Sequence, residues 1–184
     1  DETTHHPGEM VLRMADIVIV GKVNVASTAN IQAVTDNVKK VNPKAVIIKG
    51  SSPVTLENPE KVTGNRVLVV EDGPTTTHGG MAYGAGYVAA KQANPSEIVD
   101  PRPFAVAEIA KVYEKYPHLE SILPAMGYSE AQLADLEATI NKADVDVVVA
   151  ATPINLAALI SVNKPIVRAR YEFAEEDSPG LTEQ

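Results

Sequence analysis

Apolar residues recur along the chain in two alternating patterns. Short continuous apolar runs are typical of strands that helices cover on both faces of a sheet. The runs that predict strands are Ile17–Val20, Ala45–Ile48, Val67–Val70, Glu97–Val99, Val145–Ala150 and Ile166–Phe173. Between them, apolar residues at helical spacing predict helices near 8–14, 28–41, 81–93, 105–113, 130–140 and 156–160. Strands and helices that alternate in this way predict an α/β fold with three α/β/α layers and a mainly parallel sheet.

Length and composition indicate the domain organisation. At 184 residues the chain is long enough for one domain with a substantial core, which is aliphatic because only 4% of the residues are aromatic. We expect a single α/β domain over residues 1–174 and an acidic, flexible tail over residues 175–184. The first residue is Asp rather than Met, so we expect either a processed N-terminus or a segment of something longer.

Charge and composition also limit the kinds of molecule that the protein is expected to bind. The formal net charge of −8 argues against a nucleic-acid-binding surface, where basic residues would dominate. A phosphorylated small-molecule ligand is compatible with this charge, because a few local cations can reverse the field inside a cleft. The absence of cysteine excludes disulfides and thiolate metal sites and agrees with a cytoplasmic location. No apolar run approaches the ~20 residues of a membrane span, so we expect no membrane contact.

The segment after the strand Val67–Val70 carries the strongest candidate chemistry. From residue 71 to residue 90 it reads EDGPTTTHGGMAYGAGYVAA. A glycine- and threonine-rich loop between a strand and a helix leaves backbone N–H groups unpaired, and such groups bind phosphate. An ordinary strand-to-helix connection is the alternative, since Gly and Pro are normal in turns. We expect a phosphate-binding loop over Gly73–Gly80, and its candidate ligand-binding residues are Thr75, Thr76, Thr77, Gly79 and Gly80.

Three residues in or near this segment are candidate catalytic groups. His78 could hold a phosphate or transfer a proton near neutral pH. Asp72 ends an apolar strand, as a Mg²⁺-binding acid does in many phosphoryl-transfer sites, but a helix-capping acid would have the same sequence context. Arg102 lies between two prolines after a predicted strand, which suits a phosphate clamp and equally a surface ion pair.

Further cations are expected at the same edge of the sheet. Arg168 and Arg170 are two residues apart on a strand and so point to the same face, where they could bind an anion or protect an edge strand. If the site brings two phosphates together, several cations must offset the repulsion between them. We therefore expect Lys22, Arg102 and at least one of these two arginines to face His78.

Several segments of the chain resemble one group of proteins. They are HPGEMVLRMADIVIVGKV, VNPKAVIIKGSSPV, RVLVVEDGPTTTHGGMAYGAGYVAA, EIVDPRPFAV, KYPHLESILPAMGYSEAQLADLEATIN and NKPIVRARYEF. They resemble the cyclic 2,3-diphosphoglycerate synthetase family and its closely similar predicted P-loop GTPases. The resemblance implies the C-terminal part of a P-loop NTPase-like region. It also implies an ATP-dependent ligase that closes 2,3-bisphosphoglycerate into a cyclic phosphoanhydride, with ATP or GTP and Mg²⁺ as cofactors; we also expect a homo-oligomer.

Two departures from the family pattern matter. The chain has no Walker A loop, G-x-x-x-x-G-K-[ST], which holds the nucleotide phosphates, because no glycine stands five residues before Gly21. We expect the remainder of a parent chain, or another subunit, to supply this loop. Where the family has an NKxD-like signature this chain has Asn24, which cannot match guanine as Asp does, so adenine or no base selectivity is favoured. The resemblance places the nucleotide-base contacts at Lys22, Asn24, Ser51 and Ser52.

Three functions from different classes remain open. The first is the C-terminal segment of a ligase of the cyclic diphosphoglycerate type, in which this chain forms the acceptor-phosphate side of the site. The second is a segment of a regulatory or chaperone-like P-loop GTPase, in which the glycine-rich segment contacts a partner. The third is a non-catalytic assembly module that binds phosphate. In every case the missing Walker A loop predicts that the chain alone is inactive.

Overall fold

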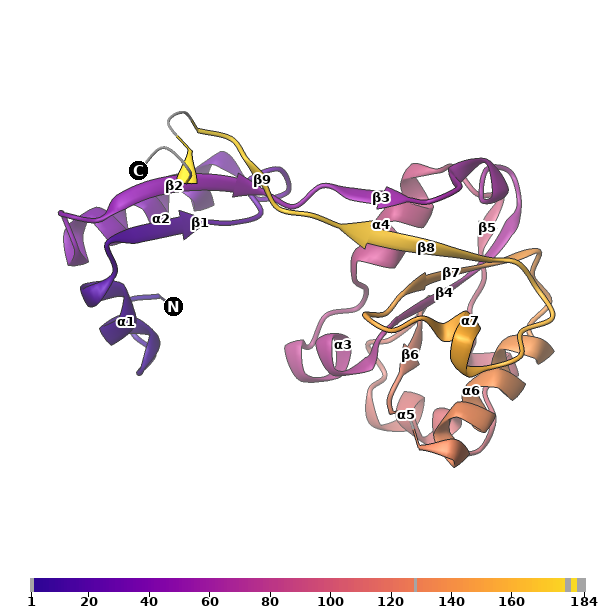
Figure 1. Ribbon diagram of the computed structural model, residues 1–184. Coiled ribbons are helices and arrows are strands. Elements are labelled where there is room, and N and C mark those ends of the chain that lie inside the picture. Colours follow the sequence, from indigo (N-terminus) through magenta and orange to yellow (C-terminus); the bar gives the residue numbers. More distant parts are fainter. Residues whose placement is uncertain (1, 128, 178–179, 182–184) are drawn as a thin grey trace. The chain divides into compact units, whose positions relative to one another are not determined.

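The computed structural model describes residues 2–127, 129–177 and 180–181. The chain divides into two compact units, unit 1 from Asp1–Pro53 with Tyr171–Gln184 and unit 2 from Val54–Arg170. Its sheets are mainly parallel and are accompanied by helices, which confirms the α/β class that the sequence predicts (Figure 1). The strands form a separate sheet in each unit, whereas the sequence prediction treats residues 1–174 as a single domain.

Unit 1 combines a parallel pair of strands with helices and one antiparallel strand. Its elements are α1 (Gly8–Met14), β1 (Ile17–Val20), α2 (Thr28–Val41), β2 (Val46–Ser51) and β9 (Ala174–Glu175). β1 runs parallel to β2, and β9 pairs antiparallel with the end of β2. The Ser27 side chain caps α2, because its hydroxyl accepts a hydrogen bond from the Asn30 N–H.

Several large apolar side chains of unit 1 are exposed. Among the described residues β1 pairs only with β2, so the other edge of β1 is open. The exposed apolar side chains of α1, β1 and the start of β2 are Met10, Val11, Met14, Ile17, Ile19 and Val46. Ile17 and Val46 are register partners on the two strands and lie side by side. An open strand edge next to exposed apolar side chains is a surface on which another strand can pair.

Unit 2 is built around a sheet in which β4 pairs with three other strands. Its strands are β3 (Val54–Leu56), β4 (Arg66–Asp72), β5 (Glu97–Ile98), β6 (Leu123–Ala125), β7 (Val147–Ala151) and β8 (Ile166–Tyr171). The order is β3-β8-β7-β4-β5, and β6 also pairs with β4. β4 runs parallel to β5, β6 and β7, and β7 runs parallel to β8. The carboxyl ends of β4, β5, β6, β7 and β8 therefore point to the same edge of the sheet.

Helices connect and cover these strands. They are α3 (Gly73–Gly79), α4 (Ala85–Gln92), α5 (Ala107–Lys115), α6 (Glu130–Lys142) and α7 (Leu156–Leu159), with 3-10 turns η1 (Pro59–Lys61) and η2 (Arg102–Phe104). α4 packs on β3, β4 and β7, whereas α5 and α6 pack against each other. Ser129 and Gln132 form a capping box at the start of α6, as their spacing predicts. None of the described helices is long and apolar enough to cross a membrane.

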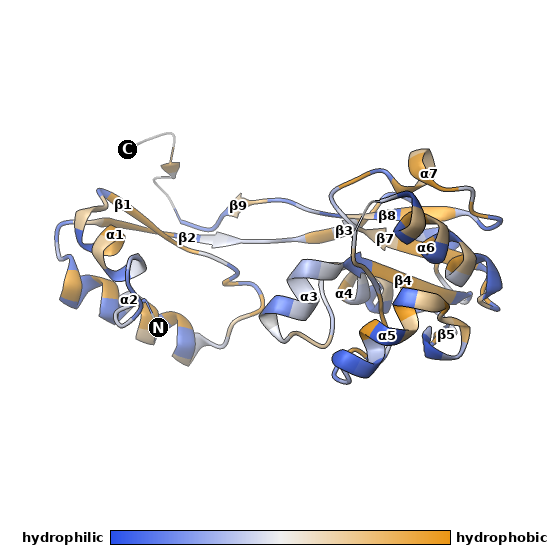
Figure 2. Cartoon of the chain, turned by 90° about the horizontal axis from the view of Figure 1, so that it is seen from below, coloured by the Kyte–Doolittle hydropathy of each residue, from blue (hydrophilic) through white to orange (hydrophobic). Residues whose placement is uncertain are grey.

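The core of unit 2 is aliphatic and centres on β4. The side chains of Val67–Val70 are fully buried, and Figure 2 shows this strand coloured hydrophobic. Burial of one such side chain stabilises the fold by about 1.5–3 kcal/mol. Because successive side chains of a strand point to opposite faces, a strand buried on both faces carries a continuous apolar run. This is why the sequence predicts β4 correctly.

Some elements differ from the sequence predictions. The sequence does not predict the short strands β3, β6 and β9, and Pro124 within β6 argues against a strand there. The predicted loop over Gly73–Gly80 is wrong, because Gly73–Gly79 form the helix α3. The predicted flexible tail begins instead with Glu175 in β9, and the Asp177 carboxylate then accepts a hydrogen bond from the Lys49 N–H.

Candidate functional site

Two acids end the strand β4, and the first of them is buried. Glu71 is 3% exposed, and its Oε1 accepts hydrogen bonds from the N–H groups of Gly84 at 3.0 Å and Tyr87 at 2.9 Å. These N–H groups lie at the start of α4, so the carboxylate caps that helix. Burial raises the pKa of the Glu71 carboxyl above its ordinary value, and the backbone hydrogen bonds oppose part of this shift.

Two glycines make room for this carboxylate and for the strand beside it. A Cβ atom on Gly84 would lie 2.7 Å from Oε2 of Glu71, and a Cβ atom on Gly86 would lie 2.6 Å from the Cβ of Ala151. Non-bonded atoms do not approach so closely, so only glycine fits at positions 84 and 86 without a shift of the structure. Part of the glycine-rich pattern that predicts phosphate binding is therefore explained by an internal carboxylate at a helix N-terminus.

Asp72 begins α3 as a helix-capping acid. Its Oδ2 accepts hydrogen bonds from the Thr75 hydroxyl at 2.7 Å and from the Thr75 N–H at 3.4 Å. The hydroxyls of Thr76 and Thr77 donate to the Gly73 carbonyl oxygen at 3.0 Å and 2.9 Å. The three threonine hydroxyls therefore have partners within α3 and its cap, in place of the open loop that the sequence predicts.

The last turn of α3 carries His78, whose ring is exposed. Its Nδ1 lies 3.1 Å from the Pro74 carbonyl oxygen. When Nδ1 donates to that oxygen, Nε2 carries the lone pair and can accept a proton. Gly80 ends the helix with a φ of 61°, a left-handed conformation typical of glycine at this position. His118 also contacts α3, because its Nε2 lies 3.2 Å from the Thr76 carbonyl oxygen.

The carboxyl ends of β4 and β6 lie side by side at the start of α3. Asp72 and Ala125 are register partners, and a Cβ atom on Gly73 would lie 2.4 Å from the Ala125 carbonyl oxygen. This close approach explains why glycine begins α3. It also brings α3 next to the segment that leads from β6 into α6.

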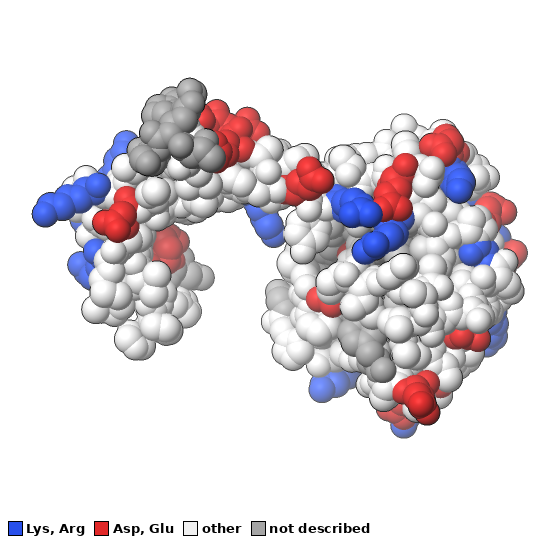
Figure 3. Space-filling model, viewed as in Figure 1, with Lys and Arg blue, Asp and Glu red and all other residues white. Residues whose placement is uncertain are grey.

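The predicted cluster of arginines is divided among separate ion pairs. Arg102 pairs with Asp100, with Nη2 2.6 Å from Oδ2, and Arg170 pairs with Glu57. Both pairs are partly exposed, and for Arg102 this agrees with the surface-ion-pair alternative. Arg168 is half-buried on β8, and among the described residues no hydrogen bond or ion pair engages its guanidinium. On the face that Figure 3 shows, basic and acidic side chains lie next to each other over β3 and β8.

In unit 1 the carboxyl ends of β1 and β2 bring together residues that the resemblance assigns to base contact. The Ser52 N–H donates to Asn24 Oδ1 at 3.0 Å, and Asn24 Nδ2 donates to the Ser52 carbonyl oxygen at 3.3 Å. The Ser51 hydroxyl donates to the Ala174 carbonyl oxygen at 3.3 Å. Lys22 is exposed, with a φ of 59°, and belongs to a different unit from His78. Asn24 thus joins the segment after β1 to the segment after β2, and base binding by these residues stays a prediction.

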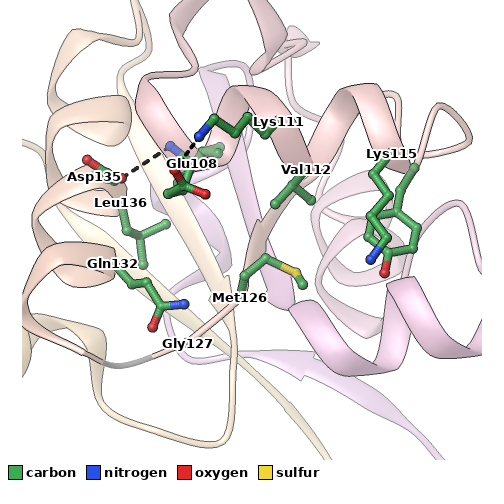
Figure 4. A pocket seen from close by; sticks show the side chains of 11 residues that line it. Glu108, Lys111, Val112, Lys115, Met126, Gly127, Gln132, Asp135 and Leu136 are labelled. Atoms are coloured by element: carbon green, nitrogen blue, oxygen red, sulfur yellow. Dashed lines mark hydrogen bonds and ion pairs between the residues drawn. The ribbon is translucent and has the colours of Figure 1, made fainter.

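A groove of about 290 Å³ lies between α5 and α6 (Figure 4). The lining side chains of interest are Glu108, Val112, Lys115, Met126, Asp135 and Leu136. They come from three separate segments that share no sequence motif, so sequence reasoning missed this site. Only the packing of α5 against α6 brings them together.

The described residues do not form a metal centre by themselves. No group of three or more His, Asp or Glu side chains among them could hold a metal ion. Mg²⁺ bound to a nucleotide commonly takes one or two carboxylates together with phosphate oxygens. Asp72 fits as one such ligand, although its Oδ2 already accepts from Thr75. The chain does not supply the groups that usually hold the nucleotide phosphates, because its sequence has no Walker A loop.

Comparison with known proteins relates the chain to a named enzyme. No protein-family model matches the sequence. The chain is 53% identical over 182 residues to the arginine synthetase ArcE of Thermococcus kodakarensis. The match covers 99% of this chain but 41% of that protein, so the chain spans about two-fifths of the length of its curated relative. Over almost its whole length, the chain is thus similar to one part of a synthetase.

Proposed function

We propose that this chain is one part of an ATP-dependent ligase that forms arginine. The observation that carries this proposal is its 53% identity over 182 residues to a protein named arginine synthetase. The similarity extends over 99% of the chain and is therefore not confined to one motif. It includes both units, so the same two-unit arrangement of elements is expected in the synthetase.

A ligase that forms cyclic 2,3-diphosphoglycerate is the second candidate, on the strength of the sequence resemblance. Ring closure brings two phosphates of one molecule together, and several cations must converge to offset their repulsion. Arg102 and Arg170 are instead occupied by Asp100 and Glu57. This candidate therefore requires both arginines to exchange their acidic partners for substrate phosphates.

The nucleotide is proposed to be ATP rather than GTP. Guanine needs a carboxylate that accepts from both its N1–H and its amino group, and the matching position holds Asn24. Both ends of the Asn24 side chain already exchange hydrogen bonds with the Ser52 backbone. Asn24 therefore holds two segments together and supplies no selection for guanine.

The Walker A loop is proposed to come from outside this chain, as part of the same protein or of another subunit. The open edge of β1 and the exposed apolar side chains beside it offer a surface for that part. The chain's 41% share of its relative leaves more than enough polypeptide to supply such a part. We also propose that the protein that carries this chain is a cytoplasmic homo-oligomer.

The reverse reaction tests the product without knowledge of the precursors. The intact protein that carries this chain is incubated with arginine, ADP, phosphate and Mg²⁺, and ATP is trapped by hexokinase and glucose. Arginine-dependent glucose 6-phosphate formation supports the proposal. In a parallel arm, ATP and 2,3-bisphosphoglycerate are followed by ³¹P NMR. Cyclic product without any arginine-dependent signal would overturn the proposal in favour of the second candidate, and GTP hydrolysis indifferent to both compounds would overturn both.

A chimera provides an independent test of the part played by this chain. The matched region of Thermococcus kodakarensis ArcE is replaced by these 184 residues, with unaltered ArcE as the positive control and ArcE lacking the region as the negative control. Arginine-dependent ATP formation by the chimera is expected. A folded chimera that is as inactive as the deletion would contradict the proposal.

A further inference from the structure

The groove between α5 and α6 has opposite charges at its two ends. Glu108 at the start of α5 and Asp135 on α6 lie at one end, together with Lys111. Lys115, in the last turn of α5, lies at the other end (Figure 4). A ligand that carries a cation at one end and an anion at the other would match this arrangement of charges.

Between the charged ends the groove is apolar. Val112 and Met126 lie between Glu108 and Lys115 in Figure 4, and Leu136 completes this part of the wall. Glu108, Val112 and Lys115 are spaced at i, i+4 and i+7, so they lie along the same face of α5. Methylene groups of a ligand can therefore pack against the middle of the groove while both of its ends reach charged side chains.

One wall of the groove is held in place by the cap of α6. Gln132 Oε1 accepts hydrogen bonds from the Ser129 hydroxyl at 2.9 Å and from the Ser129 N–H at 3.3 Å. The Gln132 side chain lies against Gly127, where a Cβ atom would be only 2.2 Å from its Oε1. The wall is thus formed before any ligand arrives, as is usual for small-molecule sites.

We propose that this groove binds the amino-acid product of the ligase, arginine, which is a zwitterion with a cationic side chain. This inference rests on the proposed function. The guanidinium lies at the carboxylates of Glu108 and Asp135, and the methylene groups pack on Val112 and Met126. The α-carboxylate lies at the Lys115 ammonium. Planar guanidinium groups pair well with carboxylates because their N–H groups match the two oxygens.

The existing contacts of Glu108 and Asp135 leave their carboxylates available for such a ligand, whereas Lys115 Nζ lies 5.1 Å from the centroid of the Tyr116 ring. Glu108 pairs with Lys111 at 2.7 Å, but both side chains are about two-thirds exposed, and exposed ion pairs contribute little to stability. Asp135 accepts from the Glu108 N–H through Oδ2 at 3.3 Å, which leaves Oδ1 for the ligand. The ligand's guanidinium would replace Lys111 at the Glu108 carboxylate.

The length of the groove suits arginine. Glu108 and Lys115 are seven residues apart on α5, which corresponds to about 10 Å along the helix axis. The seven bonds from the carboxylate carbon of an extended arginine to its terminal nitrogen span about 9 Å, at roughly 1.5 Å per bond in zigzag geometry. The two charged ends of the molecule can therefore reach both ends of the groove at once.

Methionine NMR reports on the groove directly. The chain has four methionines, Met10, Met14, Met81 and Met126, of which only Met126 lines the groove. In the intact protein labelled with ¹³C-methyl methionine, arginine is expected to shift the Met126 signal, assigned by Met126→Leu, and to leave the other three unchanged. If arginine at concentrations up to millimolar shifts none of the four methionine signals, the proposal is overturned.

Paired ligands and variants separate the two ends of the groove. Glu108→Gln is expected to weaken arginine and agmatine alike by about tenfold, because both carry the guanidinium. Lys115→Met is expected to weaken arginine by about tenfold but not agmatine, which lacks the carboxylate. Glu114→Gln on α5 and Lys142→Met on α6 lie outside the groove and serve as controls. Loss of agmatine binding in Lys115→Met, or equal loss in the controls, would refute the assignment.

Failure of the groove assignment can be distinguished from failure of the proposed function. Arginine binding at Met126 in a protein without arginine-dependent ATP formation would leave the groove assignment standing and overturn the ligase proposal. Arginine-dependent ATP formation that Glu108→Gln and Lys115→Met leave unchanged would support the ligase and overturn the groove as its arginine site.

Discussion

The contact between Glu71 and the start of α4 makes a prediction that two substitutions and their combination can test. Glu71→Ala removes the acceptor of the Gly84 and Tyr87 N–H groups. Gly84→Ala leaves those N–H groups in place but puts a Cβ atom 2.7 Å from Oε2 of Glu71. Gly84 has a φ of −122°, so alanine strains no backbone there, and its cost arises from this contact alone.

The magnitudes follow from burial and distance. An unsatisfied buried donor costs about 1–3 kcal/mol, and because Gly84 and Tyr87 are half-buried we expect a total of about 2 kcal/mol for Glu71→Ala. Gly84→Ala must displace the carboxylate and is expected to cost about 1–3 kcal/mol. In the Glu71→Ala background the contact is absent, so the same substitution should cost less than about 0.5 kcal/mol. The two changes are therefore expected to couple by about 1–2 kcal/mol.

Urea unfolding followed by circular dichroism measures the four free energies of the cycle. Amide hydrogen exchange adds a local measurement, since the Gly84 and Tyr87 amides should lose protection in Glu71→Ala. Lys91→Ala replaces an exposed residue on the same helix. As a control, it should change neither the free energy of unfolding nor the protection of these two amides. A Gly84→Ala cost that is the same in both backgrounds would refute the account of the glycine.

The same carboxyl predicts a dependence on pH. Burial raises the pKa of Glu71, so the folded state holds this proton more tightly than the unfolded state does. The resulting stabilisation is complete below the ordinary pKa of 4.5 and is lost as the pH rises through the raised pKa. Glu71→Gln keeps an oxygen acceptor but cannot titrate. The free energy of unfolding of the wild type, relative to that of Glu71→Gln, should fall as the pH rises through this window, and a flat difference would contradict the pKa shift.

Three further predictions concern α3 and the chain as a whole. Gly73→Ala should destabilise the fold by about 1–3 kcal/mol, because its Cβ atom would lie 2.4 Å from the Ala125 carbonyl oxygen. Gly21→Ala, with no atom near its Cβ, is the control in urea unfolding. Asp72→Asn should keep the helix cap, with stability unchanged within about 0.5 kcal/mol, while raising the Mg²⁺ concentration for half-maximal activity of the intact protein at least about tenfold. An unchanged Mg²⁺ requirement would show that Asp72 caps the helix and does not bind Mg²⁺. The isolated 184-residue chain should not turn over ATP, and sustained hydrolysis free of contaminants would show that the chain itself binds the nucleotide phosphates.

The sequence predicts the strands of the sheet well where burial alone decides them. The apolar run Val67–Val70 is buried on both faces, and its shortness and three valines favour a strand over a buried helix segment. β6 escapes prediction because Pro124 removes a donor and the strand is too short for any alternation to be visible. Its place in the sheet depends on pairing with β4, which no local signal encodes.

The helix α3 escapes prediction for a different reason. Glycine, proline and threonine all have low helix propensity, so a run of them predicts a loop. Tertiary context and caps outweigh that propensity here: Asp72 caps the first turn, Pro74 needs no N–H partner there, and Gly80 ends the helix in the left-handed conformation. The same residue types are also common in turns, so the sequence pattern alone does not separate this helix from a loop.

The candidate site is less predictable than the fold because its contacts join residues far apart in sequence. Glu71 meets the N–H of Tyr87 sixteen residues later, and Glu108 meets Asp135 only because α5 packs on α6. The arginines illustrate the opposite case. Sequence spacing predicts a cationic cluster, but it does not reveal that Arg102 and Arg170 have acidic partners close by.

The two acids at the end of β4 show how one strand can start two helices. Consecutive side chains on a strand point to opposite faces, so Glu71 and Asp72 diverge. Glu71 accepts from the first N–H groups of α4, and Asp72 accepts from those of α3. The anion-binding capacity at the start of α4 is therefore satisfied by the protein itself, and a substrate phosphate would have to compete with a buried carboxylate held by two backbone donors. The N–H groups at the start of α4 are thus not available to nucleotide phosphates, which agrees with the expectation that the phosphate-binding loop lies outside this chain.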